Sequence, residues 1–267
     1  MQHRFEVTRS PSDLQSAITA TYDILSLNSD DPLSRATDLS GLTECLLRRF
    51  AIAGTRNDLN EALKLQTEAV DILKWHLGVK NIETQRALHT LGQVHHDLGN
   101  FKRAAGLYRD CWVQRKKMLG AEHRDTLASM SYLVAAYYSV GETDDSIRLG
   151  NRCLKQCVKP LGPWHSVTLM ATYWVMASYY KVGKYKEAVR IGEKCLSHDE
   201  GTEMAKNPEV WVVMNSLGLI SRRREKGRGI DKEMSGRKEE SFGERASGYI
   251  AEHAGVDGVI FEATSSG

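Results

Sequence analysis

The sequence predicts an all-α fold in which antiparallel helix pairs stack into a right-handed superhelical solenoid. The first observation is a period of 42 residues, at which four sets of positions recur. These sets are Leu77-Gly78, Leu119-Gly120 and Leu161-Gly162; Thr84, Thr126 and Thr168; Gly99, Gly141 and Gly183; and Cys111, Cys153 and Cys195. The second observation is apolar residues at helical spacing on both sides of each Gly in the third set. Such a period is typical of stacked supersecondary units rather than of one globular core.

The composition fits this fold and argues against several classes of partner. Hydrophobic residues make up 41% of the 267 residues, and the chain has only five prolines. The formal net charge is only +2, so we expect no nucleic-acid partner and no anionic membrane partner. No apolar run is long enough for a membrane span, and no apolar segment of a secretory signal follows the charged N-terminus. The five cysteines favour free thiols and a cytoplasmic location.

The N-terminal residues 1–57 are predicted to form variant helical units. We expect helices at about 13–27, 33–53 and 58–77, with Asp31-Pro32 and Asp58 as start signals. The second of these helices has one apolar face, which comprises Leu39, Leu42, Leu46, Leu47 and Phe50.

Residues 58–198 are predicted to form the regular array. In its first complete unit, residues 82–98 and 101–117 form two helices, and Gly99 ends the first of them with a positive φ. Two further units repeat this pattern around Gly141 and Gly183. The position of Ala104, Ser146 and Ala188 is always small, which lets another helix backbone approach closely. The position of Gly92, Val134 and Met176 is expected to face the partner helix.

The C-terminal part departs from the pattern. Residues 199–221 contain one more first helix, at 207–221, which is apolar on several sides. We expect either that the gene model is truncated or misread here, or that this surface pairs with another copy. Residues 222–267 are rich in Gly and in charges of both signs, and we expect them to be largely disordered.

The positions of Leu88, Leu91, Gly99, Ala104 and Tyr108 resemble the tetratricopeptide repeat. The longer 42-residue unit, with Leu119-Gly120, His123 and Thr126, resembles the kinesin-light-chain type and the arrays of fungal NOD-like receptors. This resemblance implies a protein-interaction scaffold or adaptor without catalysis, cofactor or metal. Its partner would be a protein or peptide.

The resemblance also implies that the first helix of each pair lines a concave groove. The implied partner-binding residues are Arg86, His89, Gln93, His96, Asp97, Ser131, Ala135, Tyr138, Tyr173, Ala177, Tyr180 and Lys181. The tyrosines would be amphipathic anchors for a ligand, or they would cover a neighbouring helix.

The residues that could carry chemistry also have structural explanations. The in-phase cysteines are expected to be packing residues, although Cys153 and Cys157 have the spacing of a helical metal-ligand pair. His123 and His165 are expected to make loop hydrogen bonds. A hydrolase that uses His95, His96, Asp97 and a cysteine remains one alternative. Another is the sensor or regulatory repeat region of a larger NOD-like receptor or caspase-like peptidase that lacks its effector domain here.

Overall fold

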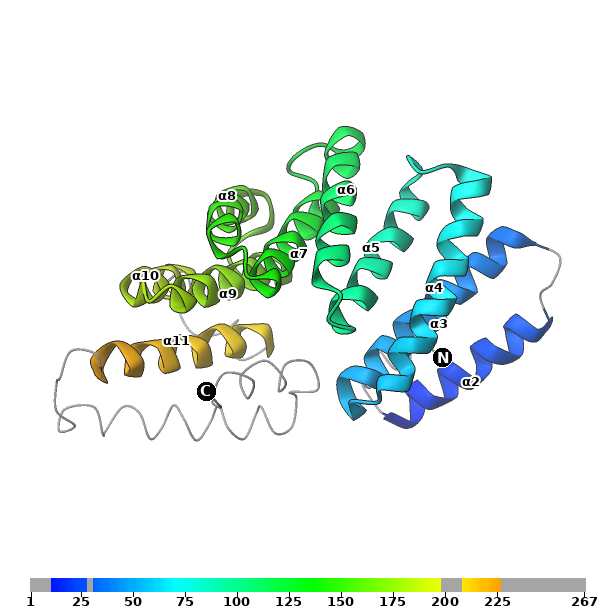
Figure 1. Ribbon diagram of the computed structural model, residues 1–267, viewed down its shortest axis with the longest axis horizontal. Coiled ribbons are helices and arrows are strands. Elements are labelled where there is room, and N and C mark those ends of the chain that lie inside the picture. Colours follow the sequence, from blue (N-terminus) through cyan, green and yellow to red (C-terminus); the bar gives the residue numbers. More distant parts are fainter. Residues whose placement is uncertain (1–10, 28–30, 198–207, 227–267) are drawn as a thin grey trace. The chain divides into compact units, whose positions relative to one another are not determined.

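The computed structural model describes residues 11–27, 31–197 and 208–226, and within these ranges it contains ten helices and no strand (Figure 1). The helices are α2 (Pro11–Leu27), α3 (Pro32–Ala53), α4 (Arg56–Leu77), α5 (Ile82–Asp97), α6 (Phe101–Leu119), α7 (Arg124–Val140), α8 (Thr143–Leu161), α9 (Ser166–Lys181), α10 (Tyr185–Leu196) and α11 (Pro208–Lys226). The all-α prediction is therefore confirmed for the described part of the chain. None of these helices is long and apolar enough to cross a membrane. They fall into two compact units, which divide between Arg115 and Lys116 inside α6.

The first unit begins with three helices that pack in chain order. α2 packs on α3, and α3 packs on α4. Leu14 and Ile18 of α2 share one buried cluster with Leu42 and Leu46 of α3. These residues recur at helical spacing, so one apolar face of each helix accounts for the contact.

The predicted helix starts in the first unit are confirmed at Asp31 and wrong at Asp58. Asp31 is the N-cap of α3, and its carboxylate accepts hydrogen bonds from the backbone N–H groups of Leu33 and Ser34. α4 instead begins at Arg56, so Asp58 lies inside its first turn. The Asp58 carboxylate is buried and accepts two hydrogen bonds from the Arg49 guanidinium, at 2.8 and 2.9 Å. Asp58 therefore joins α4 to α3 instead of capping α4.

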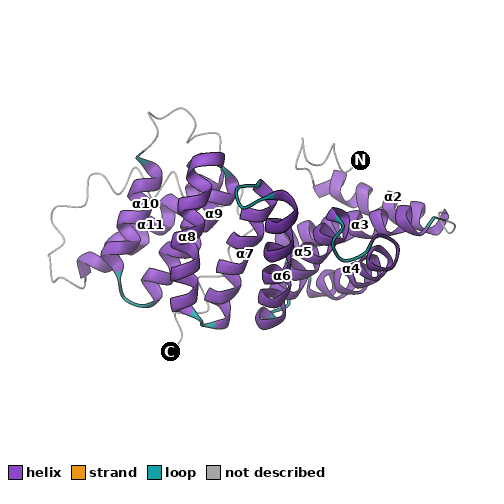
Figure 2. Cartoon of the chain, turned by 90° about the horizontal axis from the view of Figure 1, so that it is seen from above, coloured by secondary structure: helices purple, strands orange, loops and turns teal. Residues whose placement is uncertain are grey.

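The second unit repeats the helical hairpin. α7 packs on α8 and α9 packs on α10, each pair being joined by a short turn (Figure 2). α9 also contacts α7, α8 and α11, so it lies at the centre of this unit. The turn glycines have the predicted conformation, with φ of 82° at Gly99, 95° at Gly141 and 73° at Gly183.

The position that was predicted to hold only small residues lies in the interior of each hairpin, which confirms the prediction. Ala104, Ser146 and Ala188 are all fully buried. Ser146 Oγ also donates a hydrogen bond to the Val134 carbonyl across the α7–α8 pair, at 3.0 Å. The neighbouring facing position is complementary in size, because a Cβ added to Gly150 would lie 2.3 Å from Val175 Cγ2 of α9 and 3.2 Å from Val134 Cγ1 of α7. Small residues on one helix thus make room for side chains on the other.

The helix expected at 207–221 differs from its prediction in two respects. α11 continues to Lys226, five residues beyond the expected end. It packs on α9 and α10, and Val210, Val213, Met214 and Ile220 are buried. Leu219 is 40% exposed, and Val212 and Leu217 are partly exposed, so part of the apolar surface of α11 stays open. The disorder prediction for residues 227–267 lies outside the described residues.

Candidate functional site

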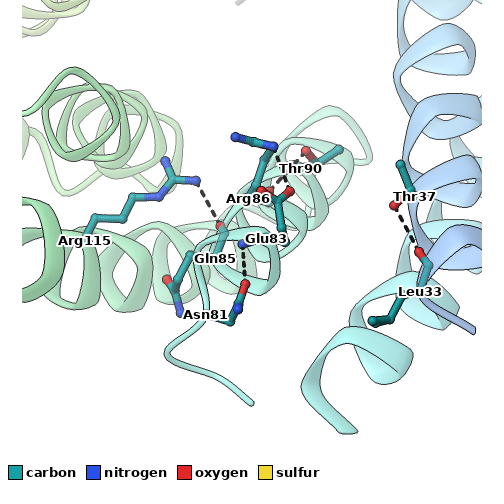
Figure 3. Close-up of polar contacts among 8 residues, drawn as sticks. All are labelled: Leu33, Thr37, Asn81, Glu83, Gln85, Arg86, Thr90 and Arg115. Carbon is teal, nitrogen blue, oxygen red and sulfur yellow. Dashed lines mark hydrogen bonds and ion pairs between the residues drawn. The ribbon is translucent and has the colours of Figure 1, made fainter. Parts of the chain in front are cut away.

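Asn81, His123 and His165, one period apart, act as N-caps of α5, α7 and α9. His123 Nδ1 accepts a hydrogen bond from the Asp125 N–H at 3.1 Å, and His165 Nδ1 accepts one from the Val167 N–H at 3.2 Å. Asn81 Oδ1 plays the same part for the Glu83 N–H (Figure 3). The predicted loop hydrogen bonds of the two histidines are confirmed, and their role is structural. Burial, followed by the nearby Arg124 charge, lowers the pKa of His165.

The in-phase cysteines are buried thiols that face backbone carbonyls. Cys111 Sγ lies 3.6 Å from the Gln85 carbonyl oxygen, and Cys153 Sγ lies 3.9 Å from the Leu127 carbonyl oxygen, one period further on. Burial raises the pKa of Cys111 to about 12, so this thiol stays protonated at neutral pH. A protonated, buried thiol is a poor nucleophile.

Cys153 and Cys157 form a pair of thiols on α8. Their Sγ atoms are 3.7 Å apart, and both side chains are fully buried. Among the described residues, no group of three or more His, Cys, Asp or Glu side chains could hold a metal ion. The two thiols therefore lack the further ligands of a tetrahedral site in that part of the chain.

The residues of the hydrolase alternative have ordinary local contacts. His95 is buried, and its Nδ1 lies 3.5 Å from the Asn100 amide nitrogen. His96 Nδ1 lies 3.5 Å from Asp97 Oδ1, and its ring packs edge-on against Phe101. No contact brings a cysteine to His95 or His96 in the described residues, and nothing in this geometry favours the hydrolase.

Five of the predicted groove residues lie on α5 in the first unit. Arg86 is exposed and pairs with Glu83 at 2.7 Å (Figure 3). Gln93 and His96 are partly exposed, and Asp97 is exposed. His89 is different, because its Nε2 atom is buried and its ring lies 5.2 Å from the Tyr108 ring. Burial and then the Arg115 charge lower the pKa of His89 to about 3.

Arg115 is the buried cation of this region. Its Nη2 donates a hydrogen bond to the Gln85 carbonyl at 3.0 Å, across the α5–α6 pair (Figure 3). Only 5% of the residue is exposed. Arg115 and His89 thus belong to the packing between α5 and α6, and His89 presents little surface to a ligand.

The other seven predicted groove residues lie on α7 and α9 in the second unit, and the structure divides them. Ser131, Ala135 and Tyr173 are buried, so the prediction that they line an accessible groove is wrong. They are covered because α9 packs on α7 and α11 packs on α9. Ala177, Tyr138 and Tyr180 are partly exposed, and Lys181 is exposed.

Tyr138, Tyr180, Lys181 and Tyr185 form a surface that we call the aromatic patch. The Lys181 Nζ atom lies 4.7 Å from the centroid of the Tyr138 ring and donates a hydrogen bond to the Tyr138 carbonyl at 3.3 Å. The rings of Tyr180 and Tyr185 lie 5.4 Å apart. Beneath the patch, the Trp174 ring lies 5.3 Å from the Tyr138 ring. These contacts hold the rings in place from α7, α9 and α10.

The chemistry of the patch is that of a hydrogen-bonding aromatic surface. Burial, followed by the neighbouring Tyr180, raises the pKa of Tyr138. Its hydroxyl is therefore a neutral donor and acceptor at physiological pH. The Lys181 ammonium adds one positive charge.

Sequence reasoning missed Tyr185 and Trp174. A partial signal for Tyr185 does exist in the repeat, because His96 and Phe101 hold the same two positions two periods earlier, although Thr143 holds the second of them one period earlier. Both pairs are five residues apart across a turn glycine, and both make ring contacts, at 5.2 and 5.4 Å. Trp174 has no such signal, since its phase is held by Thr90 and Tyr132.

Comparison with known proteins gives the fold a family context. Residues 84–125 match the tetratricopeptide repeat profile. No curated protein matches the sequence. Solved structures do match the fold. One holds nearly identical TPR-like repeats assigned to a kinesin light chain of Podosopora anserina, with a TM-score of 0.64 and 20% identity over 84% of this chain and 98% of that chain.

Two further structures extend this likeness. BtubC from P. vanneervenii has a TM-score of 0.61 and 14% identity, over 94% of this chain and 93% of that chain. A signal transduction ATPase from Pyrococcus horikoshii with a tetratricopeptide repeat sensor has a TM-score of 0.57 and 13% identity, over 92% of this chain and 41% of that chain. The fold is similar to that of kinesin-light-chain-like tetratricopeptide arrays.

Proposed function

We propose that this tetratricopeptide-repeat chain is a scaffold or adaptor that binds a peptide or helix of a partner protein on the aromatic patch. The observation that carries the proposal is the grouping of Tyr138, Tyr180 and Tyr185, three partly exposed rings from three different helices, with the exposed Lys181. Aromatic side chains are enriched among the residues that dominate binding energy at protein interfaces.

The contacts within the patch support binding because they reduce the entropy that a ligand must overcome. The Lys181 ammonium fixes the Tyr138 ring, and Tyr185 fixes Tyr180. A pre-ordered surface loses less conformational freedom when a partner arrives. The tyrosine hydroxyls can then hydrogen-bond to the backbone of the incoming segment.

The accessible groove residues of the first unit are proposed, separately from the aromatic patch, as polar contacts to a partner. Arg86, Gln93, His96 and Asp97 present charges of both signs and an amide on α5. Such groups contribute to specificity and association rate more than to affinity.

The test combines affinity capture with direct titration. Wild-type protein and the Tyr138→Ala/Tyr180→Ala variant would be used to capture partners, and each captured partner would be titrated by fluorescence anisotropy with the purified protein. Trp75→Ala is the matched control, since Trp75 is 86% exposed and lies on α4 in the other unit. We expect the double variant to bind about 10-fold to 100-fold more weakly, and the control to bind like wild type. Equal binding by all three proteins would contradict the patch as the binding site.

Three further aspects of the function are proposals of the same kind. A cytoplasmic location agrees with five free cysteines. The sensor-region alternative agrees with the fold of the Pyrococcus horikoshii protein, but that likeness does not separate it from an independent adaptor. Self-association through α11 is also a proposal: α9 and α10 pack on this helix and Val210, Val213, Met214 and Ile220 are buried, whereas Leu219 is 40% exposed.

A further inference from the structure

α8 carries two buried thiols, Cys153 and Cys157, which we call the thiol pair. The two residues lie four positions apart on the helix, so their side chains project from the same face. Both side chains are 0% exposed, and their Sγ atoms are 3.7 Å apart. The thiol pair is therefore a small sulfur-lined site that is shielded from water.

The repeat accounts for Cys153 but not for Cys157. Cys153 has counterparts one period before and one period after it, Cys111 and Cys195. Both Cys111 and Cys153 face backbone carbonyl oxygens in the same way. One period before Cys157, however, the chain has Arg115, a side chain of a different kind. Because packing of the repeat does not call for a cysteine at this position, the second thiol points to a role of the pair.

The distance between the two sulfur atoms suits an ion held between them. At a metal–sulfur bond length of about 2.3 Å, two sulfurs that share one ion lie about 3.8 Å apart at a tetrahedral angle and about 4.6 Å apart in line. The separation of 3.7 Å in the thiol pair is close to the lower of these distances, so small side-chain rotations admit an ion.

A disulfide fits the same pair less well. The Cβ atoms of residues four apart on a helix are about 5–6 Å apart, whereas a disulfide needs about 3.5–4.5 Å. A disulfide would therefore distort α8, and an ion between the sulfurs would not.

The hydrogen bond within the thiol pair prepares one sulfur as a ligand. With Cys153 as the donor, this bond lowers the pKa of Cys157, although burial opposes the effect. The same bond, together with burial, raises the pKa of Cys153. The form of cysteine that binds a metal is the thiolate. Cys157 is thus the first of the two to give up its proton to an arriving cation.

A proline next to the thiol pair weakens the last turn of α8. Pro160 lies inside the helix and has no backbone N–H, so it cannot bond to the carbonyl of Gln156, four residues earlier. Val158 and Lys159, beside this gap, are exposed. Opening of this turn costs less than opening of an intact helix, and it gives an ion a route to the buried sulfurs.

We propose that Cys153 and Cys157 bind one copper(I) ion as a two-thiolate site. Cu(I) is a soft cation that thiolates favour, and two sulfur ligands are enough for it. Structural Zn(II) sites have four ligands, and within the described ranges no group of three or more His, Cys, Asp or Glu side chains could supply them. Binding exchanges the two thiol protons for one Cu(I) ion, so the complex carries a charge of −1 and no electron is transferred.

The experiment titrates the full, reduced chain with Cu(I) in the absence of oxygen. The coloured Cu(I) chelator bathocuproine disulfonate competes for the ion and reports how much the protein takes up. The test variants are Cys157→Ala and Cys157→Ser, of which the second keeps the side-chain volume. The matched control is Cys195→Ala, which removes a buried thiol at the repeat position of Cys153. Each protein is also refolded from urea with Cu(I) present, so that slow entry into the folded protein does not decide the result.

We expect wild type and the Cys195→Ala variant to bind one Cu(I) ion per chain, with two sulfur ligands in the X-ray absorption spectrum. Both Cys157 variants should bind at least about 100-fold more weakly, because loss of a ligand costs more than loss of a residue that only orients one. Bound Cu(I) should also raise the unfolding temperature of wild type and leave that of the Cys157 variants unchanged. Circular dichroism would confirm that the variants are folded.

Three results would overturn the proposal. The first is no uptake of Cu(I) by wild type, either folded or during refolding. The second is equal uptake by wild type and the Cys157 variants. The third is an equal loss of uptake in the Cys195→Ala variant, which would assign the binding to thiols in general. Displacement of Cu(I) by an equimolar amount of Zn(II) would also overturn the choice of ion.

Discussion

Gly92 of α5 and Tyr108 of α6 share one volume. A Cβ atom on Gly92 would lie 2.7 Å from Cε1 of Tyr108, closer than real carbon contacts permit. One period later the same two positions hold Val134 and Gly150, and two periods later they hold Met176 and Gly192. In the α5–α6 hairpin the large residue lies on the second helix, whereas in the next two hairpins it lies on the first helix. Every pair contains one glycine. Each hairpin therefore pairs one glycine with one larger residue, and the next helices also approach the glycine: a Cβ would lie 2.3 Å from Val175 at Gly150 and 3.1 Å from Leu217 at Gly192.

This relationship predicts strong coupling in a double-mutant cycle. Gly92→Val alone should lower the free energy of unfolding by about 1–3 kcal/mol through overpacking. Tyr108→Gly alone should lower it by about 3–5 kcal/mol, because it leaves a cavity. The double variant rebuilds the Val134–Gly150 pair and should be more stable than the sum of the two effects by about 1–3 kcal/mol. Urea unfolding of the four proteins measures the coupling, and additive effects would refute the shared volume.

The turn glycines give a second prediction, in which backbone conformation is separated from steric space. Gly141 has a φ of 95°, and a Cβ there would meet nothing within 4 Å. Gly141→Ala should therefore destabilise the protein by about 1–2 kcal/mol through backbone strain alone.

Gly106 in the interior of α6 is the matched control. A Cβ there also meets nothing within 4 Å, but its φ is not positive. Gly106→Ala should stabilise the protein by about 0.5–1 kcal/mol, because alanine favours a helix. Thermal or urea unfolding would distinguish the two, and a shift of the same sign at both positions would count against the role given to Gly141.

The third prediction concerns the loss of folding stability in acid through protonation of His165. Its Nδ1 must be unprotonated to accept the hydrogen bond from the Val167 N–H, and its pKa is lowered in the folded state. The unfolded chain therefore binds the proton more readily. The stabilisation that the His165 cap contributes is fully present above about 6.5, the pKa of histidine in the unfolded chain. It is lost as the pH falls from there towards the lower pKa that His165 has in the folded protein.

The repeat itself supplies the test substitution, because Asn81 caps α5 at the same phase without titrating. His165→Asn should keep the cap and reduce the loss of stability between about pH 7.5 and pH 5. His165→Ala should cost about 1 kcal/mol at the higher pH. Urea titrations at both pH values measure these changes, and an unchanged pH dependence in the Asn variant would exclude His165 as a contributor.

The fourth prediction concerns the thiols. All five cysteines are free and buried, so Ellman's reagent should react slowly with the native protein. After denaturation the same reagent should modify five thiols. A count of three would indicate that Cys153 and Cys157 had joined in a disulfide. Rapid modification of the native protein would contradict the burial.

Much of the fold follows from local chemistry in the sequence. Gly99 and its counterparts reveal the turns because only glycine takes a positive φ cheaply, and the capping histidines are recognisable because they recur one period apart, before α7 and α9. The Asp58 prediction was wrong because an acidic residue in a first helical turn can serve a distant arginine, here Arg49, and the sequence does not show that partner.

The candidate site was less predictable for a geometric reason. The first helix of a hairpin contacts its partner helix and also helices of the neighbouring hairpins. A side chain at a given repeat position can therefore be exposed in one repeat and buried in another. Tyr180 is partly exposed, whereas Tyr173, two turns earlier on α9, is buried. Which tyrosine is exposed depends on neighbouring helices such as α11. The position of a residue within the repeat does not reveal those neighbours. The aromatic patch remains a proposal for this reason.

The matched Gly–large pairs also constrain how the gene could lengthen or shorten. Unequal crossing-over at equivalent codons of the α5–α6 and α7–α8 hairpins preserves both pairs only if the exchange falls in a linker between hairpins. An exchange between the two helices of a hairpin would join Val134 to Tyr108, with a collision, or Gly92 to Gly150, with a void. An exchange between the α7–α8 and α9–α10 hairpins would instead keep a glycine opposite a larger residue. Recombination that involves the first hairpin is thus restricted to whole hairpins, even though every exchange of this kind keeps the reading frame and the 42-residue spacing.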